Sequence, residues 1–371
     1  MTNTTPLPIS QIATNHQLSA VRFSGCGKFL AATGRDSTIR LWDARPLETI
    51  PAEPAPEANK KNAKSAKINI ALPELPILSE LNGWATSLVF HPTESMFFAS
   101  DSWGCLAAWQ VFAEGAVLFW KVAAAHEGWL RQLALSTDGS QLASCGNDGK
   151  IRLWNVADGS RQQEFSAGED IFSLAYHPEG KFLVSGNLRG KVQQWDLAES
   201  KSVRELDASL LYMLSFIQDV GGVRALAFDQ AGTTLAAGGI QPSGGGFVQG
   251  SPVIRCFDWT SGKETRTLQL GDNTEGFVHE LLFHANGYWL GVCSGQPGKG
   301  KYFLWNPGEE KPFFSSQGLA NCHSLALNPA GDRLAVIANE GTFGQRKSQA
   351  REGIYPGNTS PIHIFALAEQ A

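Results

Sequence analysis

The sequence predicts an all-β chain built from seven copies of one four-stranded antiparallel unit. Short apolar segments recur in seven places, and each is followed by a turn and a second apolar segment. Runs of four to eight such residues, bounded by Gly, Asp, Asn and Ser, are typical of strands joined by tight turns. A third segment then ends in a large aromatic residue in every copy, which suits a chain with 39 Gly and 11 Trp.

The clearest copy spans residues 126–165. Two apolar strands are expected at 130–135 and 141–144, separated by a Ser-Thr-Asp-Gly turn. Residues 150–155 alternate polar and apolar side chains, which predicts a half-buried third strand. After another turn, the polar run 160–165 is expected to form the outer strand.

The same order of elements repeats along the whole chain. The first strands are expected at 18–23, 87–90, 130–135, 173–176, 225–228, 281–283 and 324–327. The second strands are expected at 29–32, 96–99, 141–144, 182–185, 234–237, 289–292 and 334–337. The third strands end in Trp42, Trp109, Trp154, Trp195, Phe257, Trp305 and Phe365. The seventh copy runs out of chain before its outer strand, and residues 6–12 are expected to supply that strand.

This unit, with Trp154-Asn155 at the end of its third strand, resembles one repeat of the WD-repeat β-propeller family, which usually has Trp-Asp at that position. The resemblance implies a single domain over 1–371, an all-β, seven-bladed β-propeller of four-stranded antiparallel blades, closed by the N-terminal strand completing the last blade. The blades are expected at roughly 16–52, 80–122, 126–165, 166–205, 221–270, 276–315 and 319–367 with 5–12. Three insertions interrupt them, at 53–67, which is predicted to be disordered, and at 241–252 and 339–361.

Several polar residues match the hydrogen-bonded set that holds a blade of this family together. The full set is His126, Ser144, Asp148 and Trp154, and the first blade keeps Asp36 and Trp42. We interpret it as structural, not as a catalytic Ser-His-Asp triad, because its spacing is that of the blade and no nucleophile elbow is present. Where Trp103 and Arg189 replace Asp148, we expect blades 2 and 4 to rely more on packing. His91, His177 and His284 recur in one turn and are also interpreted as structural.

When the repeats are aligned, the family resemblance implies that one group of residues lies at the rim of the central channel, on the face where partners of this family commonly dock. The candidate partner-binding residues are Trp84, Trp129, Arg131, Phe172, Arg224, Phe277, His279 and His323. Trp and Arg are enriched at interaction hot spots. We therefore expect a non-catalytic scaffold or adaptor that binds a protein or peptide with acidic or aromatic side chains. The alternative is that these side chains only cap the blades or pack under the long loops.

The alternative function is a metal-dependent propeller enzyme with a site at the channel mouth. His279 and His323 occupy equivalent positions in blades 6 and 7, with Glu280 and Asn321 beside them, and imidazole and carboxylate groups can bind zinc. Their spacing is that of the repeat and no third ligand is evident, so no metal and no cofactor are predicted. The Gly-rich run 295–301 begins like a phosphate-binding loop, but Tyr302 replaces the required Ser or Thr and a strand follows.

Composition narrows the remaining function classes. A net charge of −5 disfavours nucleic-acid binding, and the apolar stretch 210–217 is too short to span a membrane. The N-terminus lacks the pattern of a signal peptide, and the six cysteines are far apart, so free thiols are expected. These features predict a cytoplasmic protein, either a monomer or a subunit of a larger complex.

Overall fold

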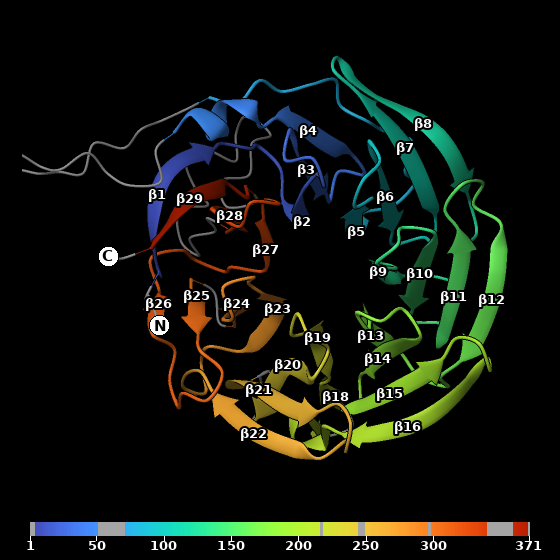
Figure 1. Cartoon of the computed structure of the whole chain (residues 1–371), viewed down its shortest axis with the longest axis vertical. Coiled ribbons are helices and arrows are strands. Elements are labelled where there is room, and N and C mark those ends of the chain that lie inside the picture. The colour runs from blue at the N-terminus through green and yellow to red at the C-terminus, as the bar shows by residue number, and fades with distance from the viewer. Residues whose placement is uncertain are drawn as a thin grey trace, which may run out of the picture.

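The strands of the computed structural model form a closed ring of seven blades around a central channel (Figure 1). The model describes residues 4–50, 71–215, 218–243, 249–295, 298–339 and 359–369. Within those ranges the seven blades are antiparallel sheets, six of four strands and one of three. The predicted all-β propeller is therefore confirmed. The predicted disordered loop at 53–67 and most of the 339–361 insertion lie outside the described residues.

The first four blades follow the chain from the inner strand outwards. Blade 1 has β2 (Leu18–Phe23), β3 (Phe29–Gly34) and β4 (Ile39–Asp43), followed by the short helix η1 (Arg45–Thr49). Blade 2 has β5 (Ala85–Phe90), β6 (Met96–Asp101), β7 (Leu106–Phe112) and β8 (Gly115–Val122). Blade 3 has β9 (Leu130–Leu135), β10 (Gln141–Gly146), β11 (Lys150–Asn155) and β12 (Arg161–Ser166). Blade 4 has β13 (Ile171–Tyr176), β14 (Phe182–Asn187), β15 (Lys191–Asp196) and β16 (Lys201–Asp207).

The remaining blades are separated from these by the helix η2 (Ser209–Leu211) and a small hairpin, β17 (Tyr212–Ser215) with β18 (Gln218–Gly221). Blade 5 has β19 (Val223–Phe228), β20 (Thr234–Pro242), β21 (Gly250–Asp258) and β22 (Glu264–Gln269). Blade 6 has β23 (Phe277–Phe283), β24 (Trp289–Ser294), β25 (Gly300–Trp305) and β26 (Phe314–Ser316). Blade 7 has β27 (Ser324–Leu327), β28 (Arg333–Ile337), β29 (Ile362–Glu369) and β1 (Thr4–Ile12).

The ring closes in blade 7, where the two ends of the chain share one sheet (Figure 1). β1 pairs antiparallel with β29, with Thr4 opposite Glu369 and Ile12 opposite Ile362. Ser360, which precedes β29, links this last blade to blade 1, because its Oγ accepts a hydrogen bond from the Leu18 amide at 3.0 Å. The predicted closure by the N-terminal strand is confirmed, and it removes an unpaired strand edge from the last blade.

Blade 1 obtains its outer edge from residues that follow the insertion at 53–67. The insertion was expected between the third and outer strands of this blade, and β4 does pair beyond it, with residues 73–78. The expected bound of 16–52 is therefore too short, and η1 begins at Arg45. The amide of Ile39 bonds to the carbonyl of Leu78 at 2.9 Å, and the reverse bond measures 3.0 Å. Pro73 and Pro76 have no amide hydrogen to donate, so this edge forms isolated bridges and no continuous strand.

Large apolar side chains fill the space between neighbouring blades. Phe97 stacks on Trp109 with ring centroids 5.2 Å apart, and both side chains are fully buried. The recurring histidines add polar links between blades: Nε2 of His177 donates to the carbonyl of Gly232 at 3.0 Å. Nε2 of His284 donates to the carbonyl of Gly331 in the same way, at 2.8 Å. Blades 4 and 5, and blades 6 and 7, are therefore linked by side-chain hydrogen bonds as well as by packing.

Two further sequence features have a clear place in the fold. The insertion at 241–252 begins as an extension of blade 5, because β20 and β21 remain paired as far as Pro242 and Gly250. All six cysteines are free thiols, and five of them are buried. Within the described ranges, none of the helices has the length and apolar character needed to cross a lipid bilayer.

Candidate interaction site at the channel mouth

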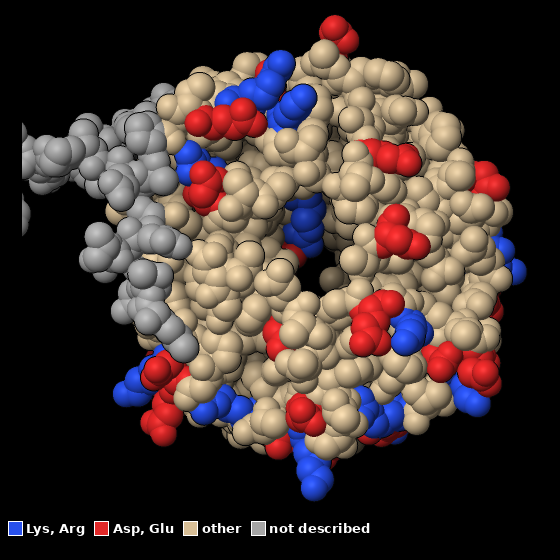
Figure 2. Space-filling model, viewed as in Figure 1, with Lys and Arg blue, Asp and Glu red and all other residues tan. Residues whose placement is uncertain are grey.

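Residues at the start of the inner strands surround the channel. They lie one per blade at an equivalent position, because the seven inner strands run in the same direction around the axis. Seven such residues line one cavity of about 240 Å³, and they are Ser19, Thr86, Arg131, Phe172, Arg224, His279 and His323. Figure 2 shows blue basic side chains in this central opening, surrounded by mostly uncharged surface. The sequence alignment of the repeats thus corresponds to a real ring of positions in space.

Cationic and aromatic side chains alternate along an arc of this mouth. The guanidinium carbon of Arg131 lies 4.9 Å from the ring centroid of Trp129 and 4.8 Å from that of Phe172. Arg224 continues the arc, at 3.6 Å from the Phe172 centroid and 5.1 Å from that of Phe277. At these distances, each cation is attracted to the negative face of a ring. The contacts connect side chains of blades 3, 4, 5 and 6.

The arc extends to blades 1 and 2 through tryptophan. Trp84 and Trp129 meet edge to face with centroids 5.8 Å apart, and the Arg35 guanidinium lies 5.6 Å from the Trp84 centroid. These two indoles are only partly covered, with 47% of Trp84 and 36% of Trp129 exposed. Large aromatic surface is therefore available next to a row of positive charges.

The arginines of the arc make few of the hydrogen bonds that they could make. Nε of Arg131 is buried without a hydrogen-bond partner, and Arg224 bonds to the carbonyl of Gly221 at 2.9 and 3.1 Å. No ion pair within the described ranges involves Arg35, Arg131 or Arg224. Burial lowers the pKa of all three, and together with the charge of Arg131 it lowers that of Arg224 to about 10. They remain cations at neutral pH, with capacity to bind an anion.

Deeper in the channel the charges are already paired. Arg22 of β2 forms an ion pair with Glu280 of β23, reaching past the inner strand of blade 7. Glu280 also accepts hydrogen bonds from the hydroxyl of Ser324 at 2.8 Å and from the amide of Leu325 at 2.9 Å. The Glu280 carboxylate is therefore neutralised by Arg22, and it does not balance the positive charges of the arc at the channel mouth.

The two histidines of the mouth are held by their own surroundings. Nε2 of His279 lies 2.8 Å from the Ser294 hydroxyl. Both nitrogens of His323 contact backbone carbonyls at 2.9 Å, those of Asn321 and Leu18. Burial lowers the pKa of both, and together with the charges of His323 and Arg224 it lowers that of His279 to about 3. Among the described residues, no group of three or more His, Cys, Asp and Glu side chains could hold a metal ion.

Two residues of this face were not among the predicted site residues. Arg35 and Trp103 both lie in turns between the second and third strands, which open on the same face as the channel mouth. The Trp103 ring lies against Gly83, next to Trp84, and 69% of it is exposed. Comparison of these turns between repeats does single out Trp103, because it stands where blade 3 has Asp148, but only as the loss of a polar blade residue.

The predicted blade network is present in blade 3 as a chain of hydrogen bonds. The Trp154 indole donates to the Ser144 hydroxyl at 2.8 Å, and that hydroxyl lies 2.7 Å from Nε2 of His126. Nδ1 of His126 lies 3.0 Å from Asp148, which also forms an ion pair with Arg152. These groups are largely buried between strands. They are placed to hold the blade together and have no open surface for a substrate.

In blade 1, what remains of this polar network lies around the turn between β3 and β4. Asp36 accepts hydrogen bonds from Arg40 and Thr38 and lies 3.3 Å from Nδ1 of His16. Burial acts to raise the pKa of Asp36, but these hydrogen bonds outweigh it and hold the pKa at about 2. Trp42 is 2% exposed and packs in the core between blades 7 and 1.

Blades 2 and 4, where Trp103 and Arg189 replace Asp148, have another polar group at this turn. Oδ1 of Asp101 accepts from the amides of Trp103 and Cys105, each at 2.9 Å. In blade 4, the side-chain oxygen of Asn187 accepts from two turn amides in the same way, at 2.8 and 3.0 Å. The polar group has moved two residues earlier in the chain, to the end of the second strand.

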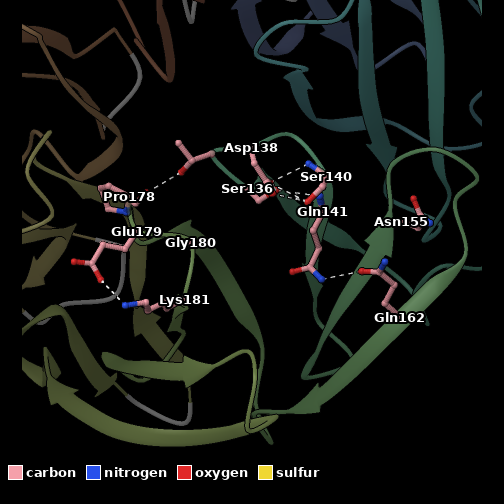
Figure 3. Close-up of a pocket in the computed structure, with 11 residues that line it drawn as sticks. Ser136, Asp138, Ser140, Gln141, Asn155, Gln162, Pro178, Glu179, Gly180 and Lys181 are labelled. Carbon is pink, nitrogen blue, oxygen red and sulfur yellow. Dashed lines mark hydrogen bonds and ion pairs between the residues drawn. The ribbon is translucent and has the colours of Figure 1, made fainter.

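A polar groove of about 560 Å³ lies between blades 3 and 4 on the opposite face (Figure 3). The turns that follow the inner strands line this groove, whereas the residues of the channel mouth lie at the start of those strands. Its side chains bond to one another: Ser136 donates to Asp138 at 2.6 Å, and Gln141 donates to Gln162 at 2.8 Å. Polar side chains of this groove are therefore hydrogen-bonded within the surface.

The Gly-rich run 295–301 has no phosphate-binding geometry in its described part. β25 begins at Gly300, so a strand and not a helix follows the run. Lys301, which would have to contact a phosphate, is 8% exposed and forms an ion pair with Glu275. Its Nζ also donates to the carbonyl of Leu270 at 2.7 Å, so the ammonium group is engaged within the fold.

The family model for the WD domain, G-beta repeat, matches residues 9–43, 120–155 and 159–196. Each match covers the three inner strands of one blade, those of blades 1, 3 and 4, together with part or all of the outer strand of the preceding blade. The chain is a seven-bladed β-propeller that carries WD repeats in these blades. The other blades of this WD-repeat propeller keep the strand order but have lost more of the side-chain signature, as the shifted Asp101 in blade 2 illustrates.

Curated relatives match parts of this WD-repeat propeller. Telomerase protein component 1 of Rattus norvegicus is 26% identical over 216 residues, which are 57% of this chain and 7% of that protein. Protein groucho of Drosophila melanogaster is 25% identical over 182 residues, 48% of this chain and 21% of that protein. Small ribosomal subunit protein RACK1 of Medicago sativa is 40% identical over 82 residues, 22% of this chain and 25% of that protein. The chain thus spans a quarter or less of the length of these relatives.

Proposed function

We propose that this WD-repeat propeller is a non-catalytic interaction scaffold that binds a protein or peptide at the mouth of its central channel. The observation that carries the proposal is the arc from Arg35 to Phe277, in which exposed indoles alternate with arginines that form no ion pair within the described ranges. Cationic and aromatic groups arranged in this way on a rigid rim are suited to act as a binding hot spot.

The arc also favours one chemistry of partner. Three arginine charges that form no ion pair within the described ranges favour an acidic segment, although Asp170 lies close enough to interact with Arg131 and Arg224. The exposed faces of Trp84 and Trp129 favour flanking apolar or aromatic side chains. An extended peptide could place carboxylates against Arg131 and Arg224 while its apolar groups cover the indoles. Burial of an unpaired guanidinium is costly, so a bound carboxylate would remove a penalty present in the free protein.

The described residues give no support to the metal-dependent alternative. His323 already contacts two carbonyls, His279 contacts Ser294, and the nearby Glu280 is paired with Arg22. We infer a scaffold working in the cytoplasm, since five buried cysteines remain thiols and a reducing compartment preserves them.

The proposal can be tested by fluorescence anisotropy with a fluorescein-labelled peptide of alternating Glu and Phe residues. We expect the wild-type chain to bind it, and we expect the affinity to fall at least tenfold in the triple variant Trp84→Ala, Trp129→Ala and Arg131→Ala. A peptide with Gln in place of Glu should bind at least tenfold more weakly, and added salt should weaken the acidic peptide most.

The matched control is a triple alanine variant on the opposite face, Thr137→Ala, Gln162→Ala and Lys181→Ala, in the groove of Figure 3. It should bind the acidic peptide as the wild type does. Circular dichroism melting should show both triple variants folded. Equal peptide binding by the wild type and the folded rim variant would overturn the proposal, as would equal binding of the Glu and Gln peptides.

A further inference from the structure

The outer strands of most blades carry features that block pairing with another sheet. β12, β16 and β22 each contain charged residues of both signs, such as Arg161 and Glu164 in β12. β26 has only three residues, and β1 contains Pro6 and Pro8. Charge, proline and short length are the usual protections of a free strand edge, because an unprotected edge offers unpaired N–H and C=O groups to any neighbouring strand.

β8 lacks these protections. It is eight residues long, it contains no proline, and Lys121 is its one charged residue. In the described sheet it pairs only with β7, so its other edge is open. The hairpin of β7 and β8 lies on the outside of the ring, where no other blade obstructs it (Figure 1).

The side chains of this edge are apolar and exposed. Val117 is 61% exposed and Phe119 is 50% exposed, and Leu118 between them is 37% exposed. Phe112, at the other side of the hairpin turn, is 50% exposed. The surface beside this hairpin carries few charges in Figure 2. Exposed apolar side chains therefore flank the open edge of β8 on both faces of the sheet, because successive residues of a strand point to opposite faces. Large exposed apolar surface is typical of an interaction site.

The two charges of the hairpin complement each other in an antiparallel pair of identical strands. Glu114 lies in the turn before β8 and Lys121 lies near the end of the strand, and both are exposed. If two β8 strands pair antiparallel, the turn of each copy lies beside the end of the other, so Glu114 of one copy meets Lys121 of the second. Lys121 already donates to the carbonyl of Glu80, but its ammonium group has three hydrogens to share.

We propose that β8 is a homodimer interface, in which the edges of two copies pair antiparallel to form one continuous eight-stranded sheet across a two-fold axis. The backbone groups of the free edge would form hydrogen bonds with the second copy, and Val117 and Leu118 would be covered. This isologous arrangement uses the same surface on both copies and leaves both channel mouths free.

Sedimentation velocity of the full chain between about 1 and 100 µM tests the proposal. We expect a concentration-dependent monomer–dimer equilibrium, with a dissociation constant raised at least tenfold by Val117→Lys. The matched control is Val203→Lys on the outer strand β16, where the replaced valine is 44% exposed. This control should leave the dissociation constant unchanged.

A charge exchange tests the pairing direction. Glu114→Lys should weaken dimerisation by like-charge repulsion, and the double variant Glu114→Lys with Lys121→Glu should restore it. A chain that stays monomeric at 100 µM overturns the proposal, as does a dimer that Val117→Lys leaves unchanged. A variant that melts like the wild type excludes misfolding as the cause of a lost dimer.

Discussion

The guanidinium carbon of Arg224 lies 3.6 Å from the ring centroid of Phe172, so a cation of blade 5 stacks on an aromatic ring of blade 4. This is the shortest of the cation–ring distances along the channel mouth. It places a buried charge over a negative π face, which partly replaces the water that the guanidinium has lost.

We expect this contact to appear as a coupling energy between the two residues. In a double-mutant cycle of Arg224→Met and Phe172→Leu, urea unfolding should give a coupling of about 0.5–2 kcal/mol, the range for a partly desolvated cation–π pair. Additive effects of the two substitutions on the free energy of unfolding would show that the contact contributes nothing.

Loss of the Ser144 hydroxyl should be costly, because it joins two buried groups at once. Ser144→Ala leaves both the Trp154 indole and the His126 ring without this partner, and we expect a loss of about 1–3 kcal/mol in the free energy of unfolding, measured with urea. Ser185 of blade 4 is the matched control, because its hydroxyl accepts the Trp195 indole at 2.9 Å within the described residues. Ser185→Ala should cost less, and equal losses would contradict the linking role of Ser144.

Acid should remove a stabilising contribution from blade 1. The folded-state pKa of Asp36 is about 2, below the ordinary value of 3.8, so the ionised form is favoured by folding. Its contribution is present above about pH 4 and is lost as the pH falls towards 2. The difference in unfolding free energy between wild type and Asp36→Asn should therefore be constant from pH 7 to 5 and shrink between pH 4 and 2. A difference that persists to pH 2 would exclude this linkage.

Removal of residues 1–12 should destabilise the whole ring, because β29 then becomes an open edge and Ile9 leaves the core of the closing blade. We expect a lower urea midpoint and a broader transition, followed by tryptophan fluorescence. Removal of residues 1–3, which precede β1, is the control and should have little effect. A truncated chain that unfolds with an unchanged midpoint and slope would contradict the importance of the closure.

Most of the fold could be predicted because the same strand pattern occurs seven times in the sequence. A weak pattern such as 173–176 becomes convincing when the spacing from its last residue to Trp195 equals the spacing from Leu135 to Trp154. The outer edge of blade 1 could not be predicted in this way. Residues 73–78 contain two prolines and form isolated bridges, so they lack the alternation and β-propensity that mark a strand.

The residues of the channel mouth could also be predicted from the repeat, because equivalent positions of the seven blades must lie around one axis. What the sequence could not supply was their contacts with each other. The stacking of Arg224 on Phe172 depends on the rotamers of two residues from different blades, about 50 positions apart. The exposed edge of β8 was also missed, because exposure depends on which strand of a blade is outermost and on what surrounds it.

The pairing of β1 with β29 also has a consequence for the time course of folding. The partner of residues 4–12 is synthesised some 350 residues later, so β1 must remain unpaired while six blades are made. Until β29 is made, the nascent chain is an open arc, and its first strand has an unpaired edge that can bind other strands. We expect chaperone dependence and misassembly to concentrate in this interval, before the last strand leaves the ribosome.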